Sequence, residues 1–128
     1  MHTEIRFPSG LPGFPGDRSF TVETVEGTPL VRLTSDDVGF VALEDPGRFF
    51  PEMSPLVLDD QTVDVLGARD PSDIETLVIL TIRETSVTGN LLGPIVVNRH
   101  NGIAVQAVVR DRSASVAAPL DLTVTCSS

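Results

Sequence analysis

Short apolar runs separated by turn residues constrain the fold of this chain more than any other feature. The runs span residues 20–24, 29–33, 38–43, 56–58, 76–83, 95–98 and 103–109. Valine, isoleucine and threonine number 17, 6 and 12, and their β-branched side chains favour a pleated, half-buried backbone over a helix. Short strands interrupted this often predict a mostly β protein, built as a sandwich or barrel of antiparallel hairpins.

Two segments give the clearest predictions of individual strands. The pair Asn101-Gly102 lies between two strand-like runs and suits the positive φ angles of a tight hairpin turn. Residues 77–82 are apolar without alternation, which predicts a central strand buried on both faces.

Helix is expected only in one or two short turns. Residues 59–67 combine an acidic cap, apolar side chains at Val63 and Leu66, and a terminating glycine, which predicts about two helical turns. A second turn is expected from Asp70, with Pro71 at the first helical position and Asp73 near the positive end of the helix dipole.

The length of 128 residues fits one domain with its own core and is too short for two ordinary domains. We expect a single β domain over residues 1–120 and a flexible tail over residues 121–128, which are small and polar. Cys126, in that tail, is the single cysteine and cannot form an internal disulfide.

The charge balance restricts the partners that the chain can bind. Nine basic residues, all arginine, face 18 acidic ones, so the net charge is −9. Direct binding of nucleic acid is not expected, because it draws mainly on lysine and arginine to neutralise phosphates, whereas a basic protein is a plausible partner. The sequence has no apolar run of signal-peptide or membrane-spanning length, so no membrane association is expected and the cytoplasm is the default location.

The sequence gives little support for catalysis. Neither His2 nor His100 has an acid or nucleophile at a spacing that indicates a triad, and His100 is expected to be a solvated turn residue. With one cysteine and two isolated histidines, no zinc site is expected, and no cofactor is predicted. Paired acids at 36–37, 44–45 and 59–60 could serve acid/base chemistry or hold a divalent cation, but turns and helix caps explain them better.

Two further features could present side chains to a partner. Phe49 and Phe50 follow a loop that contains acids, so one ring could fill the core while the other anchors a partner, although packing of both is favoured. The polar connection at 85–94 either turns the chain or presents side chains at the surface.

Three segments, in this order and spacing, resemble the family of the flagellar assembly factor FliW. Residues 5–14 (IRFPSGLPGF) are similar to the opening phrase of that family, and residues 44–51 (EDPGRFFP) to its central segment. Residues 88–98 (TGNLLGPIVVN) are similar to its Thr-Ala-Asn-Leu and Pro-Ile-Val-Ile-Asn signature, and Gly102 and Gln106 continue the pattern. The resemblance extends from about residue 5 to residue 120.

Two departures from the family pattern carry expectations. The family usually has another strand and turn before the opening phrase, so the N-terminus is expected to be truncated or to lack the first hairpin, which would leave a sheet edge uncovered. Gly89 stands where the family more often has alanine, and we expect it to loosen the loop slightly.

The resemblance implies a small antiparallel β-barrel-like domain that acts by binding rather than by catalysis. It implies two cytoplasmic partners, flagellin and CsrA, a small dimeric RNA-binding repressor that blocks translation of the flagellin message. Binding of the two would be mutually exclusive, so that flagellin depletion frees the factor to antagonise CsrA. The net negative charge fits a partner with a basic, RNA-binding surface.

Eight residues are candidate partner contacts on the basis of charge and loop position. The acidic candidates are Glu44, Asp45, Asp59, Asp60 and Asp64. Phe49 is the candidate apolar anchor, and Thr88 and Asn90 are candidate polar contacts. The alternatives are a small carboxylate-dependent hydrolase, which would need Glu44, Asp45 and Asp59 around one cavity, and an inert structural β domain.

Overall fold

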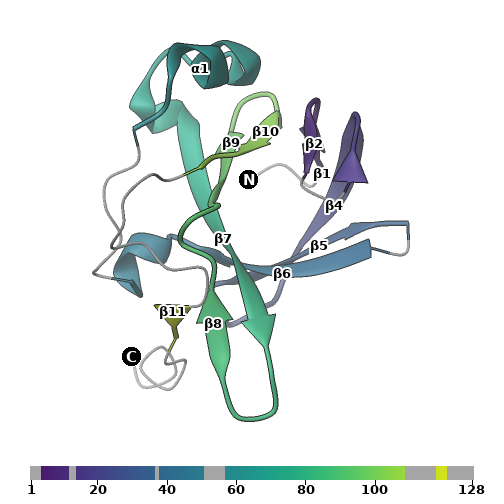
Figure 1. The fold of residues 1–128 in the computed structure, drawn as a ribbon, viewed down its shortest axis with the longest axis vertical. Coiled ribbons are helices and arrows are strands. Elements are labelled where there is room, and N and C mark those ends of the chain that lie inside the picture. The colour runs from purple at the N-terminus through teal and green to yellow at the C-terminus, as the bar shows by residue number, and fades with distance from the viewer. Residues whose placement is uncertain (1–3, 12–13, 37, 51–56, 109–117, 121–128) are drawn as a thin grey trace.

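The main sheet rolls into a nearly closed barrel (Figure 1). The computed structural model describes residues 4–11, 14–36, 38–50, 57–108 and 118–120. The strands of the main sheet are β1 (Glu4–Phe7), β4 (Arg18–Thr24), β5 (Leu30–Ser35), β6 (Val38–Glu44), β7 (Ile74–Ile82), β8 (Val87–Gly89), β9 (Ile95–Asn98), β10 (Ala104–Gln106) and β11 (Ala118–Pro119). Strands β2 (Gly10–Leu11) and β3 (Phe14–Pro15) form a separate hairpin, and the helical elements are η1 (Pro46–Arg48), α1 (Asp60–Leu66) and η2 (Pro71–Asp73). The predicted fold class, a mostly β, antiparallel, barrel-like domain with short helical turns, is confirmed.

Strand β7 is the centre of the sheet, as its apolar sequence predicted. It pairs with β6 along one edge, and along the other edge with β9 at its start and with β8 at its end. Leu77 and Val78, which point to opposite faces, are both fully buried. Leu80 is the last buried residue of the strand, and the prediction of burial over 77–82 fails at its end, because Thr81 is exposed and Ile82 is 56% exposed where β7 runs into its hairpin with β8.

The first strand meets the β9–β10 hairpin, which nearly closes the barrel. The backbone N–H of Arg6 donates to the carbonyl of Gly102 at 2.9 Å, and Arg6 forms a parallel bridge with Ile103. The expected uncovered edge is therefore wrong at Arg6, because this contact covers the side of β1 opposite β4.

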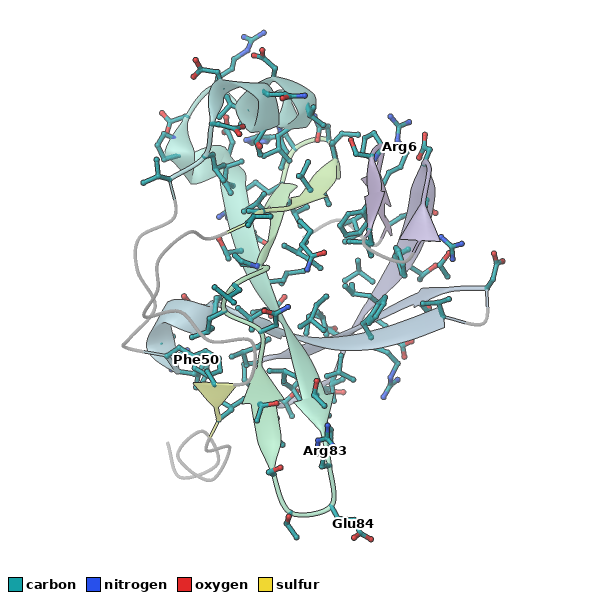
Figure 2. The ribbon with its side chains drawn as sticks, in the orientation of Figure 1. Arg6, Phe50, Arg83 and Glu84 are labelled. Carbon is teal, nitrogen blue, oxygen red and sulfur yellow. The ribbon has the colours of Figure 1, made fainter. Side chains whose placement is uncertain are left out.

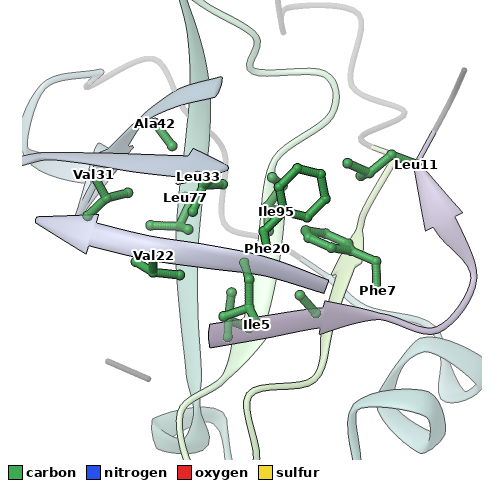
Figure 3. Packing of buried hydrophobic residues seen from close by; sticks show 12 residues of the cluster. Ile5, Phe7, Leu11, Phe20, Val22, Val31, Leu33, Ala42, Leu77 and Ile95 are labelled. Carbon is green, nitrogen blue, oxygen red and sulfur yellow. The ribbon is translucent and has the colours of Figure 1, made fainter. Parts of the chain in front are cut away.

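Two apolar clusters fill the molecule. The larger lies inside the barrel, where Phe7 and Phe20 meet edge to face with ring centroids 5.6 Å apart (Figure 3). The smaller joins β6, β7 and β8 to the segment after η1 through Leu43, Val78 and Phe50. Apolar burial on both faces of β7 thus fixes the sheet between two cores.

Both predicted helical turns are confirmed with their caps. The Asp59 carboxylate accepts from the N–H of Thr62 at 2.8 Å, and α1 ends at Gly67 with a φ of 69°. Asp70 and Asp73 form a capping box around η2.

The hairpin predicted around Asn101-Gly102 exists, but its turn is longer than a two-residue turn. Gly102 has a φ of 74° and Asn101 has no positive φ. The N–H of Gly102 donates to the carbonyl of Asn98, so residues 99–102 form a four-residue loop.

The expectation that Gly89 loosens a loop is wrong. Gly89 is a buried residue of strand β8, not part of a loose loop. A Cβ there would lie 2.8 Å from Cζ of Phe50 and 2.9 Å from Cγ1 of Val78, so the glycine makes room for a ring. In the run predicted at 56–58, Val57 and Leu58 lie in no strand, and residue 56 is outside the described residues.

Candidate protein-binding surface

Acidic residues concentrate at the end of the barrel that carries α1 and η2. Residues 57–75 contain six acids and one cation, Arg69, and Arg99 of the β9–β10 hairpin pairs with Glu75 at 3.3 Å. Figure 2 shows oxygen-tipped side chains projecting outward around α1. The three predicted acids Asp59, Asp60 and Asp64 lie here, in or directly before α1.

The outward face of α1 carries like charges at an unfavourable spacing. Asp60 and Asp64 are four residues apart and both exposed, while Leu66 faces the core with no exposed surface. Like charges at this spacing destabilise a helix, and the last turn of α1 has no basic side chain to favour its dipole. The two like charges on this face therefore lower the stability of α1.

Two asparagine side chains fix α1 to the β9–β10 hairpin. The amide nitrogens of Asn98 and Asn101 both donate to the carbonyl of Leu66, at 2.8 and 3.1 Å. Asn98 is 3% exposed, and its amide oxygen accepts from the N–H of His100. This role of Asn98 could not be predicted, because nothing in the sequence shows that the end of α1 lies next to the end of β9.

A groove runs between α1 and the start of β7. It has a volume of about 380 Å³. Its apolar walls are Leu58, Val63, Ala68, Pro71 and Ile74, and its polar lining is Arg69, Asp70 and Thr76. We call this feature the α1 groove.

The side chain of Asp73 links η2 to the loop of the β9–β10 hairpin. Its carboxylate accepts from the N–H groups of Arg69 and Asp70 at 3.0 and 3.1 Å, and lies 2.8 Å from Nε2 of His100. The bond from Arg69, followed by that from His100, lowers the pKa of Asp73 below its usual value. The His100 side chain is 69% exposed, as expected for a turn residue, but it is also bonded to Asp73.

A second group of predicted contacts lies around η1. Glu44 ends β6 and is half-buried, and burial followed by repulsion from Glu75 raises the pKa of Glu44. Asp45 is exposed, has a φ of 49° and makes no side-chain bond to cap η1.

The two phenylalanine rings after η1 differ in burial. Phe50 is 1% exposed, and Figure 2 shows it beside β11. Phe49 packs against the same cluster but is only half-buried, and the guanidinium carbon of Arg48 lies 5.5 Å from its ring centroid. Both rings pack, as favoured, and Phe49 keeps an accessible surface.

The two predicted polar contacts lie on and after β8. Thr88 pairs with Thr81 on one side and with Pro119 on the other. The amide oxygen of Asn90 accepts from the N–H groups of Leu92 and Gly93, at 3.1 and 3.2 Å, and so shapes its own turn. Both side chains are half-buried.

The eight predicted residues therefore form two groups rather than one site. Figure 1 shows α1 at one end of the barrel, with η1 and β8 farther along it. Contact between Phe50 and Gly89 places η1 next to β8, so the second group spans both elements.

The α1 groove does not have the arrangement that a carboxylate-dependent hydrolase would need. Its lining contains none of Glu44, Asp45 and Asp59. Within the described ranges, no three His, Cys, Asp or Glu side chains are grouped so that they could hold a metal ion. None of the helices in those ranges has the length and apolar character needed to cross a membrane.

Comparison with known proteins gives one consistent result. A family model described as "FliW protein" matches residues 1–120. The chain is 37% identical to the flagellar assembly factor FliW of Bacillus licheniformis over 115 residues, which cover 85% of this chain and 79% of the relative. It is 36% identical to FliW of Bacillus subtilis over 122 residues, which cover 91% and 84%.

The fold agrees with a solved structure of the same kind. A crystal structure of the flagellar assembly factor FliW superposes with a TM-score of 0.81 at 29% identity, covering 93% of this chain and 87% of that one. Sequence and fold therefore agree over nearly the whole chain, and this protein belongs to the FliW family of flagellar assembly factors.

Proposed function

We propose that this protein is a non-enzymatic regulator that binds flagellin and antagonises the translational repressor CsrA in the cytoplasm. The observation that carries the proposal is the acidic end of the barrel in a member of the FliW family. An RNA-binding repressor needs basic surface to neutralise phosphates, and that surface is complementary to Asp59, Asp60 and Asp64.

Binding of the two partners is mutually exclusive in this proposal. Excess flagellin occupies the protein and leaves CsrA free to repress the flagellin message. When flagellin is depleted, the protein is released and removes CsrA from that message. Flagellin supply is thereby coupled to flagellin synthesis.

The second group of residues extends the proposed binding surface. Phe49 offers a half-buried ring directly after η1. Glu44 ends β6, Asp45 lies directly before η1, and Thr88 and Asn90 lie on and directly after β8. An aromatic side chain with polar neighbours is typical of an interface anchor.

Size-exclusion chromatography with purified partners tests the proposal. We expect the protein to co-elute with flagellin and, separately, with CsrA from the same organism, and flagellin to displace CsrA. Because the CsrA contact is electrostatic, we expect salt to weaken that complex. Failure to co-elute with either partner at low salt would contradict the proposal.

Charge removal tests the acidic contacts on α1. We expect D60N/D64N to lower the affinity for CsrA about ten-fold at low salt, through loss of two exposed charges at the interface. Asp59 is left intact, because its carboxylate caps the helix. The matched control is E26Q/E84Q, which removes two exposed acids in turns away from α1; equal loss in both variants, or no loss in either, would rule out the α1 acids.

A further inference from the structure

The α1 groove has apolar walls, and acidic side chains lie beside it. Its volume of about 380 Å³ lies near the lower end of the range for ligand pockets, about 300–1,000 Å³. That space fits one or two large apolar side chains rather than a whole helix. Leu58, Val63 and Ile74 come from three different parts of the chain and together form its walls.

Carboxylates lie around these walls. Asp70 lines the groove itself, and Asp60 lies one helical turn before Val63, on the neighbouring side of α1. Within residues 57–75, Arg69 is the single cation against six acids, of which Glu75 pairs with Arg99 and Asp73 is bonded to His100.

Apolar surface continues beyond the groove. Val57, next to Leu58 in the chain, is 93% exposed. The apolar walls of the groove are accessible beside Asp70, and accessible apolar surface with a polar rim is typical of a protein-binding site.

We propose that the α1 groove binds a short amphipathic segment of a basic partner protein. One or two apolar side chains of that segment enter between Leu58, Val63 and Ile74, and its flanking lysine or arginine side chains pair with Asp60 and Asp70. The proposal rests on the proposed function in taking the partner to be basic. It adds an apolar anchor point on α1, separate from Phe49.

Charge complementarity selects this occupant over a second copy of the chain. A second copy carries a net charge of −9 and would bring its own acids to an acidic surface. A basic segment neutralises the acidic side chains beside the groove, and its apolar side chains are removed from water when they enter the groove.

The first test uses a probe of defined chemistry. A synthetic peptide of about twelve residues with leucines at positions i, i+3, i+4 and i+7 and lysines elsewhere is titrated into the isotope-labelled protein. The control peptide has the same composition in scrambled order. We expect the patterned peptide to shift amide resonances of residues 58–76 and to bind about ten-fold tighter than the scrambled one. Equal binding, or shifts spread over the whole chain, would overturn the proposal.

Two variants test the groove independently. A68F places a ring in the groove without changing charge, and L58S removes an apolar wall at a residue outside any helix or strand. We expect each to weaken the patterned peptide about ten-fold, as loss of an apolar anchor does. L58S keeps the test valid if A68F fails to fold, and unchanged affinity in a folded variant would overturn the proposal.

The same variants separate this proposal from the proposed function. If CsrA co-elutes equally well with wild type, A68F and L58S, the groove proposal fails and the proposed function stands. If the peptide binds in the groove but neither flagellin nor CsrA co-elutes, the proposed function fails and the groove site stands. A concentration-dependent dimer that A68F dissociates would overturn the proposal, since a second copy would then occupy the groove.

Discussion

The absence of a side chain at Gly89 makes room for the Phe50 ring. The Phe50 ring packs against its backbone, and through this contact the segment after η1 joins the smaller core. A Cβ at this position would meet Phe50 and Val78 at distances below 3 Å, so both side chains would have to move. An alanine here would need a different position for this ring.

We expect G89A to destabilise the protein by about 1–3 kcal/mol, the usual cost of overpacking a core. Chemical denaturation followed by circular dichroism measures the change. Gly39 is the matched control, because a Cβ there meets Cγ2 of Thr34 at 3.8 Å, an ordinary contact. A G39A variant as destabilised as G89A would show that the loss of glycine, not the contact with Phe50, causes the effect.

Glu44 makes stability depend on pH in a direction that can be tested. Burial, then Glu75, raises its pKa in the folded state, so folding favours the protonated form. The stability associated with that proton is present below the unfolded pKa of about 4.5 and is lost as pH rises through the folded value. We expect E44Q to be more stable than wild type at pH 7 and to lose that advantage below about pH 4.5. Thermal melts of E44Q and of E26Q, a control in an exposed turn, at both pH values would detect this; an advantage independent of pH would contradict it.

At the scale of the element, α1 shows what local sequence determines. Asp59 and Gly67 mark its ends through bonds made within a few residues, so the helix could be predicted from those residues alone. Its position could not be predicted, because the bonds to the carbonyl of Leu66 come from Asn98 and Asn101, more than thirty residues later. The α1 groove follows from that position and was therefore invisible in the sequence.

Reversing one charge on α1 separates stability from binding. D64K replaces a repulsive pair with Asp60 by an attractive one and places a cation in the last helical turn. We expect it to raise the free energy of unfolding by about 0.5 kcal/mol while lowering the affinity for CsrA. Denaturation and calorimetric titration measure the two quantities, with E26K as the control for an equal charge change away from α1. A loss of stability together with affinity would point to a purely structural role for Asp64.

The shortest strands of the sheet could not be predicted from the sequence. Strand β7 was evident because five of the six residues at 77–82 are apolar. Strands β8 and β11 are three and two residues long, and they pair with each other through Gly89 and Ala118, 29 positions apart. Such pairing depends on tertiary contacts rather than on propensity, so a single sequence gives no signal for it.

For the whole molecule, the net charge of −9 affects folding and binding in opposite directions. Raising the ionic strength from about 0.01 M to 0.15 M shortens the Debye length from about 30 Å to 8 Å. We expect the melting temperature to rise, because self-repulsion in the compact state is screened, and the affinity for CsrA to fall, because attraction is screened too. Differential scanning fluorimetry and calorimetric titration over a sodium chloride series test this. A melting temperature that falls with salt would contradict the first half of the prediction.

The bond from Arg6 to Gly102 joins two points of the chain that are synthesised far apart in time. Strand β1 can pair with β4 once the first two dozen residues have left the ribosome, but its other side stays open until the turn before Ile103 has emerged. At translation rates of about 5–20 residues per second, that interval lasts several seconds, during which the nascent sheet has a bare edge open to mispairing. Completion of the barrel is therefore a late event in synthesis.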